Sequence, residues 1–226
     1  KKIAAGSKYL LIDIPYGRGS KVDTKKNAKE LGAGFSNIAK EFGLKIKIVY
    51  TDGRSPIGQG VGPTLEMFDV LSVLRNEPNC CDAFKKKSLY LSSELMKLCG
   101  IKKAKQKAKE ILESGKALEK FKQIINTQNG IKDFDKRVGA LKLGGTSFNV
   151  TAKIGGRIKH IDNKRINNLC HTLGAPDSKG AGVFLKIKRK MRIKKGQSLF
   201  VMYSESKKKM ADAKRFLKIL NPIELS

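Results

Sequence analysis

The chain of 226 residues contains no tryptophan, two histidines and four cysteines. Cys80, Cys81, Cys99 and Cys170 show no Cys-x-x-Cys spacing and the histidines are not clustered, which argues against a zinc site. Adjacent cysteines such as Cys80 and Cys81 have a poor geometry for bonding to each other. We therefore expect free thiols in a reducing cytoplasm and no bound metal.

Long apolar runs are also missing. None approaches the roughly 20 residues that a membrane-spanning helix needs, and residue 1 is a lysine that no signal-peptide pattern follows. Hydrophobic residues still make up 40% of the chain, enough for a core in one large domain or two small ones. We expect a globular protein whose sequence begins partway through a longer one.

Acidic residues are scarce: 20 Asp and Glu stand against 48 Lys and Arg, for a formal net charge of +28. This charge invites a nucleic-acid interpretation. Lysines, however, far outnumber arginines and are dispersed along the chain, whereas recognition of bases and phosphates favours the guanidinium fork. The favoured interpretation is a lysine-rich solvated surface, a trend of proteins from hot environments. A nucleic-acid surface and simple attraction of small anions are the alternatives.

The first 50 residues follow the pattern of a βαβ unit. Residues 8–14 are a nearly unbroken apolar run, typical of a buried parallel strand. Residues 23–42 carry apolar or small side chains at helical spacing and stop at Gly43. Residues 45–50 alternate as a strand does. We therefore expect two parallel strands joined by a helix through a right-handed crossover.

Further helices are predicted over residues 64–74 and over three segments between residues 85 and 127. Composition changes near residue 139, where short strand-like runs between glycine turns begin. These strands cover 147–154, 156–161, 182–187 and 198–203, with helices over 163–173 and 205–219. The predicted fold class is α/β, a βαβ-containing mixed sheet with helices, followed by a small β-rich, barrel-sandwich-like C-terminal domain. The predicted domains are residues 1–142 and 143–226.

A glycine-rich loop follows each strand of the βαβ unit, at the edge where parallel sheets bind ligands. The first, residues 13–21, could let backbone amides approach an anion, but no Walker pattern is present and an ordinary tight loop is the simpler interpretation. The second, residues 51–63, contains four glycines and two prolines and leads to Glu66 at the start of a helix. Glu66 either contributes to a ligand-binding site at this edge, or its negative charge is only stabilised by the field of the helix terminus.

No self-evident catalytic machinery is present. His160 and His171 lie in the β-rich region with no neighbouring nucleophile pattern, so we expect packing or surface roles for them. The motifs Gly-x-Ser-x-Gly and His-Glu-x-x-His are absent, and so is any paired carboxylate spacing. The basic stretch 186–196 is interpreted as a structural hairpin, because the segment 194–199 resembles a turn common in barrel-sandwich hybrid domains.

Several stretches, taken together, resemble the archaeal branch of the thymidine phosphorylase family, whose best-known activity is that of AMP phosphorylase. Residues 1–6 resemble the end of the family's Ser-x-x-x-Lys-Lys-x-Ala-x-Gly helix, and residues 13–22 resemble the following strand and loop. The most specific block is Thr51-Asp52-Gly53 with Pro56-Ile57-Gly58 and Gly62-Pro63-Thr64-Leu65-Glu66. The resemblance continues in family order through residues 108–117, 174–182 and 203–206.

This resemblance implies where the chain lies in the family's fold. Residues 1–6 would end a helix of the small helical domain, the chain up to residue 142 would be the latter part of the α/β domain, and residues 143–226 would be the C-terminal β-rich domain. The family's phosphate-binding segments would precede the chain, as would the serine four residues before Lys1. The 226 residues alone are therefore expected to be inactive.

The resemblance further implies reversible phosphorolysis by a pentosyltransferase: inorganic phosphate attacks C1′ of the sugar and the base leaves. By motif position, Lys1 is the expected substrate-binding residue, placed against the base or against a neighbour that relays a proton, and Lys2 is the adjacent helix residue. Inorganic phosphate is the co-substrate, and no catalytic residue, cofactor or metal is assigned. Family members are typically dimers or larger, so a homo-oligomer is expected.

The substrate and two alternatives complete the expectations. The loops that begin Asp13-Ile14-Pro15 and Thr51-Asp52-Gly53 resemble those of the archaeal members more than those of the bacterial members that act on thymidine. This resemblance favours a nucleoside 5′-monophosphate such as AMP as the substrate and ribose 1,5-bisphosphate as the product. The first alternative is a pyrimidine (thymidine) nucleoside phosphorylase. The second is a non-catalytic basic module for RNA or acidic partners. The lack of tryptophan and the placement of most Phe residues on apolar helical faces argue against it, since such modules expose aromatic rings for stacking.

Overall fold

The computed structural model describes residues 2–130 and 133–226. It divides into two compact units. The first comprises the chain up to Arg54 together with Asp82–Lys116, and the second comprises Ser55–Cys81 together with Ala117–Ser226. Each unit therefore combines two stretches that are separated in the sequence. The domain boundary expected at residues 142 and 143 stays a prediction.

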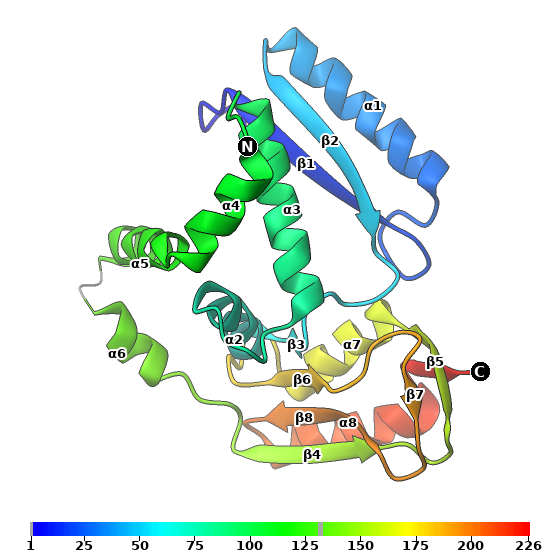
Figure 1. The fold of residues 1–226 in the computed structure, drawn as a ribbon. Coiled ribbons are helices and arrows are strands. Elements are labelled where there is room, and N and C mark those ends of the chain that lie inside the picture. The colour runs from blue at the N-terminus through cyan, green and yellow to red at the C-terminus, as the bar shows by residue number, and fades with distance from the viewer. Residues whose placement is uncertain (1, 131–132) are drawn as a thin grey trace. The chain divides into compact units, whose positions relative to one another are not determined.

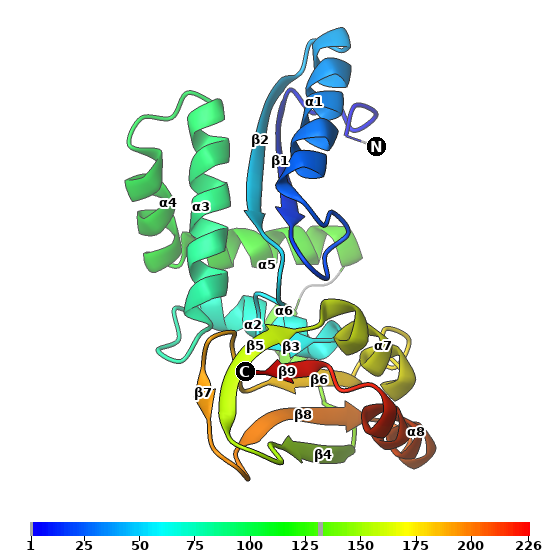
Figure 2. The ribbon, with the colours of Figure 1, turned by 90° about the vertical axis from the view of Figure 1, so that its right-hand side faces the viewer.

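The first unit contains a two-stranded parallel sheet with helices on both faces (Figures 1 and 2). Its elements are β1 (Tyr9–Tyr16), α1 (Lys25–Glu41), β2 (Lys45–Asp52), α3 (Asp82–Leu98) and α4 (Ala104–Glu113). The strands pair residue for residue, from Tyr9 opposite Lys45 to Tyr16 opposite Asp52. The predicted βαβ unit is confirmed.

Helix α1 packs on the sheet through small residues. Thr24 caps its start, where Oγ1 accepts a hydrogen bond from the Asn27 N–H at 3.2 Å. Ala28, Gly32 and Ala39 are the buried residues of the helix. A Cβ atom on Gly32 would collide with the Tyr50 hydroxyl, so glycine sets how closely α1 approaches β2.

The second unit holds the remaining elements, apart from the first residue of α5. These are β3 (Gly60–Val61), α2 (Pro63–Leu74), α5 (Lys116–Asn129), α6 (Phe134–Gly139), β4 (Thr146–Thr151), β5 (Gly156–Ile161), α7 (Asn163–Leu173), β6 (Gly182–Leu185), β7 (Arg192–Ile193), β8 (Ser198–Ser204), α8 (Lys207–Ile219) and β9 (Ile223–Leu225). The strands form a four-stranded sheet, β3-β6-β8-β4, and a three-stranded sheet, β7-β5-β9. All their pairings are antiparallel.

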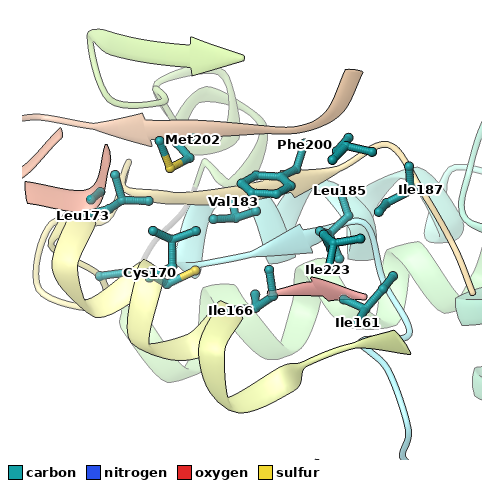
Figure 3. Packing of buried hydrophobic residues seen from close by; sticks show 14 of the residues in the cluster. Ile161, Ile166, Cys170, Leu173, Val183, Leu185, Ile187, Phe200, Met202 and Ile223 are labelled. Carbon is teal, nitrogen blue, oxygen red and sulfur yellow. The ribbon is translucent and has the colours of Figure 1, made fainter. Parts of the chain in front are cut away.

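One apolar core holds this unit together (Figure 3). Helix α7 presents Ile166, Leu169 and Leu173, all fully buried, to a cluster that includes Val183 of β6 and Phe200 of β8. The spacing of three and four residues on α7 places these side chains on one face of the helix. Alternate residues of β6 and β8 contact them. The apolar residues on one face of the helix and those on one face of the sheet therefore form a single core.

Strand β3 joins this core from a distant part of the sequence. Gly60 pairs with Phe184 and Val61 with Val183, although more than 100 residues separate the two strands. The close approach depends on glycine: at Gly62, φ is 127°, and a Cβ there would collide with the Ala181 carbonyl oxygen. A Cβ on Gly182 would likewise collide with the Val61 carbonyl oxygen.

The predicted fold class is confirmed: a βαβ unit with helices, and a β-rich C-terminal part. The described strands do not close into a barrel. The basic stretch 186–196 contains β7 and part of a tight turn in which the Gln197 Oε1 accepts from the Lys194 N–H at 3.0 Å. None of the helices in the described ranges is long and apolar enough to cross a bilayer.

Replacing Ile166 by alanine should destabilise the second unit by roughly 2–5 kcal/mol, because it removes a fully buried side chain and leaves a cavity. Urea unfolding followed by circular dichroism measures the effect. Ile219→Ala is the matched control, because Ile219 is 80% exposed at the end of α8, and it should change stability by about 0.5 kcal/mol or less. Equal losses in the two variants would contradict this description of the core.

Candidate functional site

Three polar side chains meet on one face of the β1–β2 sheet. Asp13 lies on β1, Thr51 on β2 and Lys87 on α3. Thr51 Oγ1 donates to one Asp13 carboxylate oxygen at 2.6 Å. The Lys87 ammonium lies 2.6 Å from the other carboxylate oxygen and donates to Thr51 Oγ1 at 3.0 Å. We call these three residues the Asp13–Lys87 cluster.

The register of the sheet explains why the cluster forms. Thr51 pairs with Pro15, two residues after Asp13, so the side chains of Asp13 and Thr51 point to the same face. Tyr50, the neighbour of Thr51, points to the opposite face, where α1 packs. Helix α3 supplies Lys87 on the face of the cluster. The cluster lies towards the carboxyl ends of the strands, the edge at which parallel sheets bind ligands.

Partial burial makes this ion pair more than a surface contact. The side chains of Lys87 and Asp13 are 20% and 19% exposed, so solvent screens the pair less than it screens surface pairs. Two of the three ammonium donors of Lys87 are directed to Asp13 and Thr51. The cluster therefore holds a cation at a defined position, which suits binding of an anion or stabilisation of negative charge that develops during a reaction.

The loop after β1 is closed by its own hydrogen bonds. Ser20 Oγ donates to the Gly17 and Val22 carbonyl oxygens at 2.6 and 2.9 Å. The N–H of Gly17 donates to the Val22 carbonyl at 2.9 Å, and that of Ser20 donates to the Gly17 carbonyl at 3.0 Å. These two amides are engaged within the loop, which favours the tight-loop interpretation of residues 13–21 over an anion cradle at Gly17 and Ser20.

The loop after β2 packs against the first loop. The Gly53 N–H donates to the Tyr16 carbonyl at 2.9 Å, and a Cβ on Gly17 would collide with the Arg54 side chain. Arg54 Nε and Nη2 donate to the two Asp52 carboxylate oxygens at 2.8 and 2.7 Å. The hydrogen bonds and charge of Asp52 raise the pKa of Arg54. The two loops thus support each other beside the cluster.

The rest of the specific motif block lies in the second unit, where Glu66 of the block and Asp69 of the following helix stabilise the backbone. Asp69 is buried, and its Oδ2 accepts from the Gln59 and Gly60 N–H groups at 2.7 and 2.8 Å. Glu66 Oε1 accepts from the Gly62 N–H at 3.1 Å, at the start of α2. Between the two interpretations of Glu66, this contact favours the helix-start role.

The two histidines and Cys170 have surroundings typical of residues with a structural role. His160 is buried on β5, and His171 Nδ1 lies 3.0 Å from the Ala175 carbonyl oxygen, to which the ring N–H donates. Burial raises the pKa of the Cys170 thiol to about 12, so this thiol is protonated and unreactive at neutral pH. Within the described ranges, no group of three or more His, Cys, Asp or Glu side chains is arranged to hold a metal ion.

Lys1, the expected substrate-binding residue, lies outside the described residues. Its neighbours 2–6 form turns, with the Gly6 N–H donating to the Ile3 carbonyl at 2.9 Å. The sequence motifs included Asp13 and Thr51 but not Lys87. Lys87 is one of three consecutive lysines at the start of a helix, and only tertiary packing shows which of them faces the sheet.

Curated relatives cover the entire chain. An AMP phosphorylase from Pyrococcus abyssi is 37% identical over 100% of this chain and 45% of its own length. An AMP phosphorylase from Methanococcus maripaludis is 35% identical over the same shares. A protein from Rhodopseudomonas palustris that is provisionally named a thymidine phosphorylase is 40% identical over 92% of this chain and 40% of its own length. No protein-family model matches the sequence.

The chain spans less than half the length of these relatives, and it matches their C-terminal part. The order of the motif blocks that the sequence shares with the phosphorylases agrees with this alignment. Over its whole length, therefore, the chain belongs to the family of AMP and thymidine phosphorylases and corresponds to the C-terminal part of its members.

Proposed function

We propose that the chain serves in the phosphorolysis of a nucleoside 5′-monophosphate by inorganic phosphate. The supporting observation is that relatives named AMP phosphorylase align with all of the chain at 35–37% identity. The substrate would be AMP or a close analogue, and the products would be the free base and ribose 1,5-bisphosphate. The reaction makes the enzyme a pentosyltransferase.

The proposed reaction forms one bond at C1′ of the ribose and breaks another. A phosphate oxygen forms a bond to C1′ of the ribose while the bond from C1′ to the base nitrogen breaks, and the base takes up a proton. The enzyme must hold the phosphate in line, stabilise positive charge on the sugar and neutralise negative charge on the leaving base. Phosphate is the second substrate, and we propose no further cofactor.

The described residues can meet one of these demands. The Asp13–Lys87 cluster fixes an ammonium group beside the loops that follow β1 and β2, with two of its three donors already engaged. We propose that this cation, held in place by Asp13 and Thr51, orients an anionic group of the substrate. Lys1 is proposed to contact the base, or a neighbour that relays a proton to it.

A thymidine-cleaving activity is the second candidate, and the relative from Rhodopseudomonas palustris at 40% identity is the observation that favours it. In either case the proposed enzyme is a cytoplasmic homo-oligomer acting on small molecules. The net charge of +28 on this chain would raise the local concentration of anionic substrates such as phosphate and a nucleoside monophosphate.

Substrate choice can be tested on an enzyme that carries this chain as its C-terminal part, for example after fusion to the N-terminal part of the Pyrococcus abyssi relative. We expect phosphate-dependent release of adenine from AMP at a kcat/KM at least about tenfold above that for release of thymine from thymidine. Liquid chromatography of the bases measures both. A preference for thymidine would favour the second candidate, and base release by the 226 residues alone would contradict the expectation that they are inactive.

In the same enzyme, Lys1→Ala should lower kcat/KM for AMP by about 100-fold or more, because a charged or proton-relaying contact to the leaving base is lost. Lys2→Ala is the matched control, since it removes an equal charge from the adjacent position. Steady-state kinetics measure both variants. If Lys1→Ala leaves the kinetics unchanged, the assignment of Lys1 is wrong.

Lys87→Met should lower kcat/KM and also destabilise the first unit by roughly 1–3 kcal/mol, because the Asp13 carboxylate loses a partly buried charged partner. The double variant Asp13→Asn/Lys87→Met removes both charges, so it should regain stability but not activity. Unfolding curves and kinetics measure the two effects separately. Lys86→Met is the control, because its ion pair with Asp82 is largely exposed. Recovery of activity in the double variant would reduce the cluster to a structural role.

A further inference from the structure

Two arginines lie directly opposite each other in the sheet β7-β5-β9 of the second unit. Arg157 of β5 pairs with Arg192 of β7 in the antiparallel register, so both side chains leave the same face of the sheet, with Cβ atoms about 4.5–5.5 Å apart. Both residues are exposed. Like charges at directly opposite positions destabilise a sheet. The stability of the fold therefore does not explain why the two positions carry the same charge.

The two arginines border a hollow of about 370 Å³. It is lined by Gly156, Arg157, Arg192, Ile193 and Ser226. The Arg157 guanidinium is oriented by its Nε, which donates to the Lys190 carbonyl at 3.0 Å. The main chain of Arg157 is held as well, because its N–H and carbonyl bond to Ser226 at 3.0 and 2.9 Å. A guanidinium fixed in this way has Nη groups that can donate parallel hydrogen bonds to a phosphate.

The strands around the hollow belong to parts of the sequence without acidic residues. Residues 136–161 contain six Lys and Arg, residues 178–204 contain eight, and neither range contains an Asp or Glu. Glu224, on the third strand of the sheet, lies 3.0 Å from the Lys159 ammonium. The fold thus gathers cations on this face, and the local positive charge favours an anionic ligand.

The cations extend beyond the hollow along the basic stretch. Every second side chain from residue 186 to residue 194 is an exposed cation: Lys186, Lys188, Lys190, Arg192 and Lys194. Of the residues between them, Ile187 and Ile193 are buried and Met191 packs against the core. These apolar side chains account for a structural hairpin, but the hairpin does not require a cation at each outward position. A single phosphate contacts one or two of these cations, whereas a ligand with several linked phosphates contacts more.

We propose that this face binds linked phosphate groups, with one phosphate held in the hollow between Arg157 and Arg192 and the next ones beside the outward lysines. The linked phosphates belong either to the backbone of an RNA or to the phosphate chain of a nucleoside triphosphate. Contact with phosphates needs no stacking on aromatic rings, so the lack of tryptophan does not argue against it. The site belongs to the second unit, whereas the Asp13–Lys87 cluster belongs to the first, and the inference does not depend on the proposed reaction.

The test measures binding of the 226-residue chain to three probes: ATP, AMP and a fluorescent RNA of about 12 nucleotides. Calorimetry measures the nucleotides and fluorescence anisotropy measures the RNA. We expect AMP, with one phosphate, to bind at least about tenfold more weakly than ATP. If about four phosphates of the RNA are neutralised, its affinity should fall about 50-fold between roughly 50 and 200 mM salt. Binding of only ATP or only RNA would support the site and identify the source of the phosphates.

Replacing both arginines should weaken binding without unfolding the protein. Arg157→Gln/Arg192→Gln is expected to lower the affinity for ATP and RNA at least about tenfold, while the melting temperature stays the same or rises because two opposed like charges are removed. Arg157→Lys/Arg192→Lys keeps both charges but removes the guanidinium forks, so it should also bind more weakly than the unsubstituted chain. This second variant keeps the test decisive if the glutamine variant is unstable.

Lys207→Gln/Lys208→Gln is the matched control, because it removes the same number of exposed charges from α8. Figure 2 shows α8 and β7 at opposite ends of the second unit. The control should change the affinity for either ligand by less than about threefold. The proposal is overturned if neither ATP nor RNA binds, if AMP binds as tightly as both, or if the control loses as much affinity as the arginine variants.

Discussion

The ion pair between Lys87 and Asp13 joins the two sequence segments of the first unit. The strands come from the first 54 residues, whereas α3 begins at Asp82. The contact that ties α3 to the sheet at this point is polar, with a carboxylate, a hydroxyl and an ammonium group within 2.6–3.0 Å of one another. A partly buried pair has a desolvation cost that good geometry must offset. Thr51 provides that geometry by donating to Asp13 and accepting from Lys87.

The two units are stabilised in different ways. The second has a continuous apolar core, in which α7, β6 and β8 supply fully buried side chains, and glycines at positions 62 and 182 let β3 reach it. The first has a two-stranded sheet, small residues under α1, and the polar cluster under α3. Several of its large apolar side chains are exposed on α1 and at its C-terminal end, namely Leu31, Phe35, Ile38 and Phe42. The first unit is also the part of the chain that carries the candidate site.

The described residues supply a fixed cation and two mutually supporting loops, while the carboxylates of Glu66 and Asp69 stabilise backbone at the start of α2. Part of the specific sequence block, from Pro56 to Glu66, therefore serves the path of the chain. The same block also positions β3 against β6, because Gly62 allows the chain to approach Ala181 closely.

The sequence alone predicted those helices and strands in which the hydrophobic period repeats over enough residues to be recognised. The βαβ unit, α7, α8 and most strands of the β-rich part follow from patterns of two and of 3.6 residues, and the ordered motif blocks were enough to indicate the family. Strands of two or three residues, such as β3, β7 and β9, carry no readable period. Tertiary structure alone decided that β3 belongs to a sheet whose other strands follow residue 145, and that Lys87, among three consecutive lysines, faces Asp13. Both depend on contacts between residues far apart in the chain, and a local pattern contains no information about them.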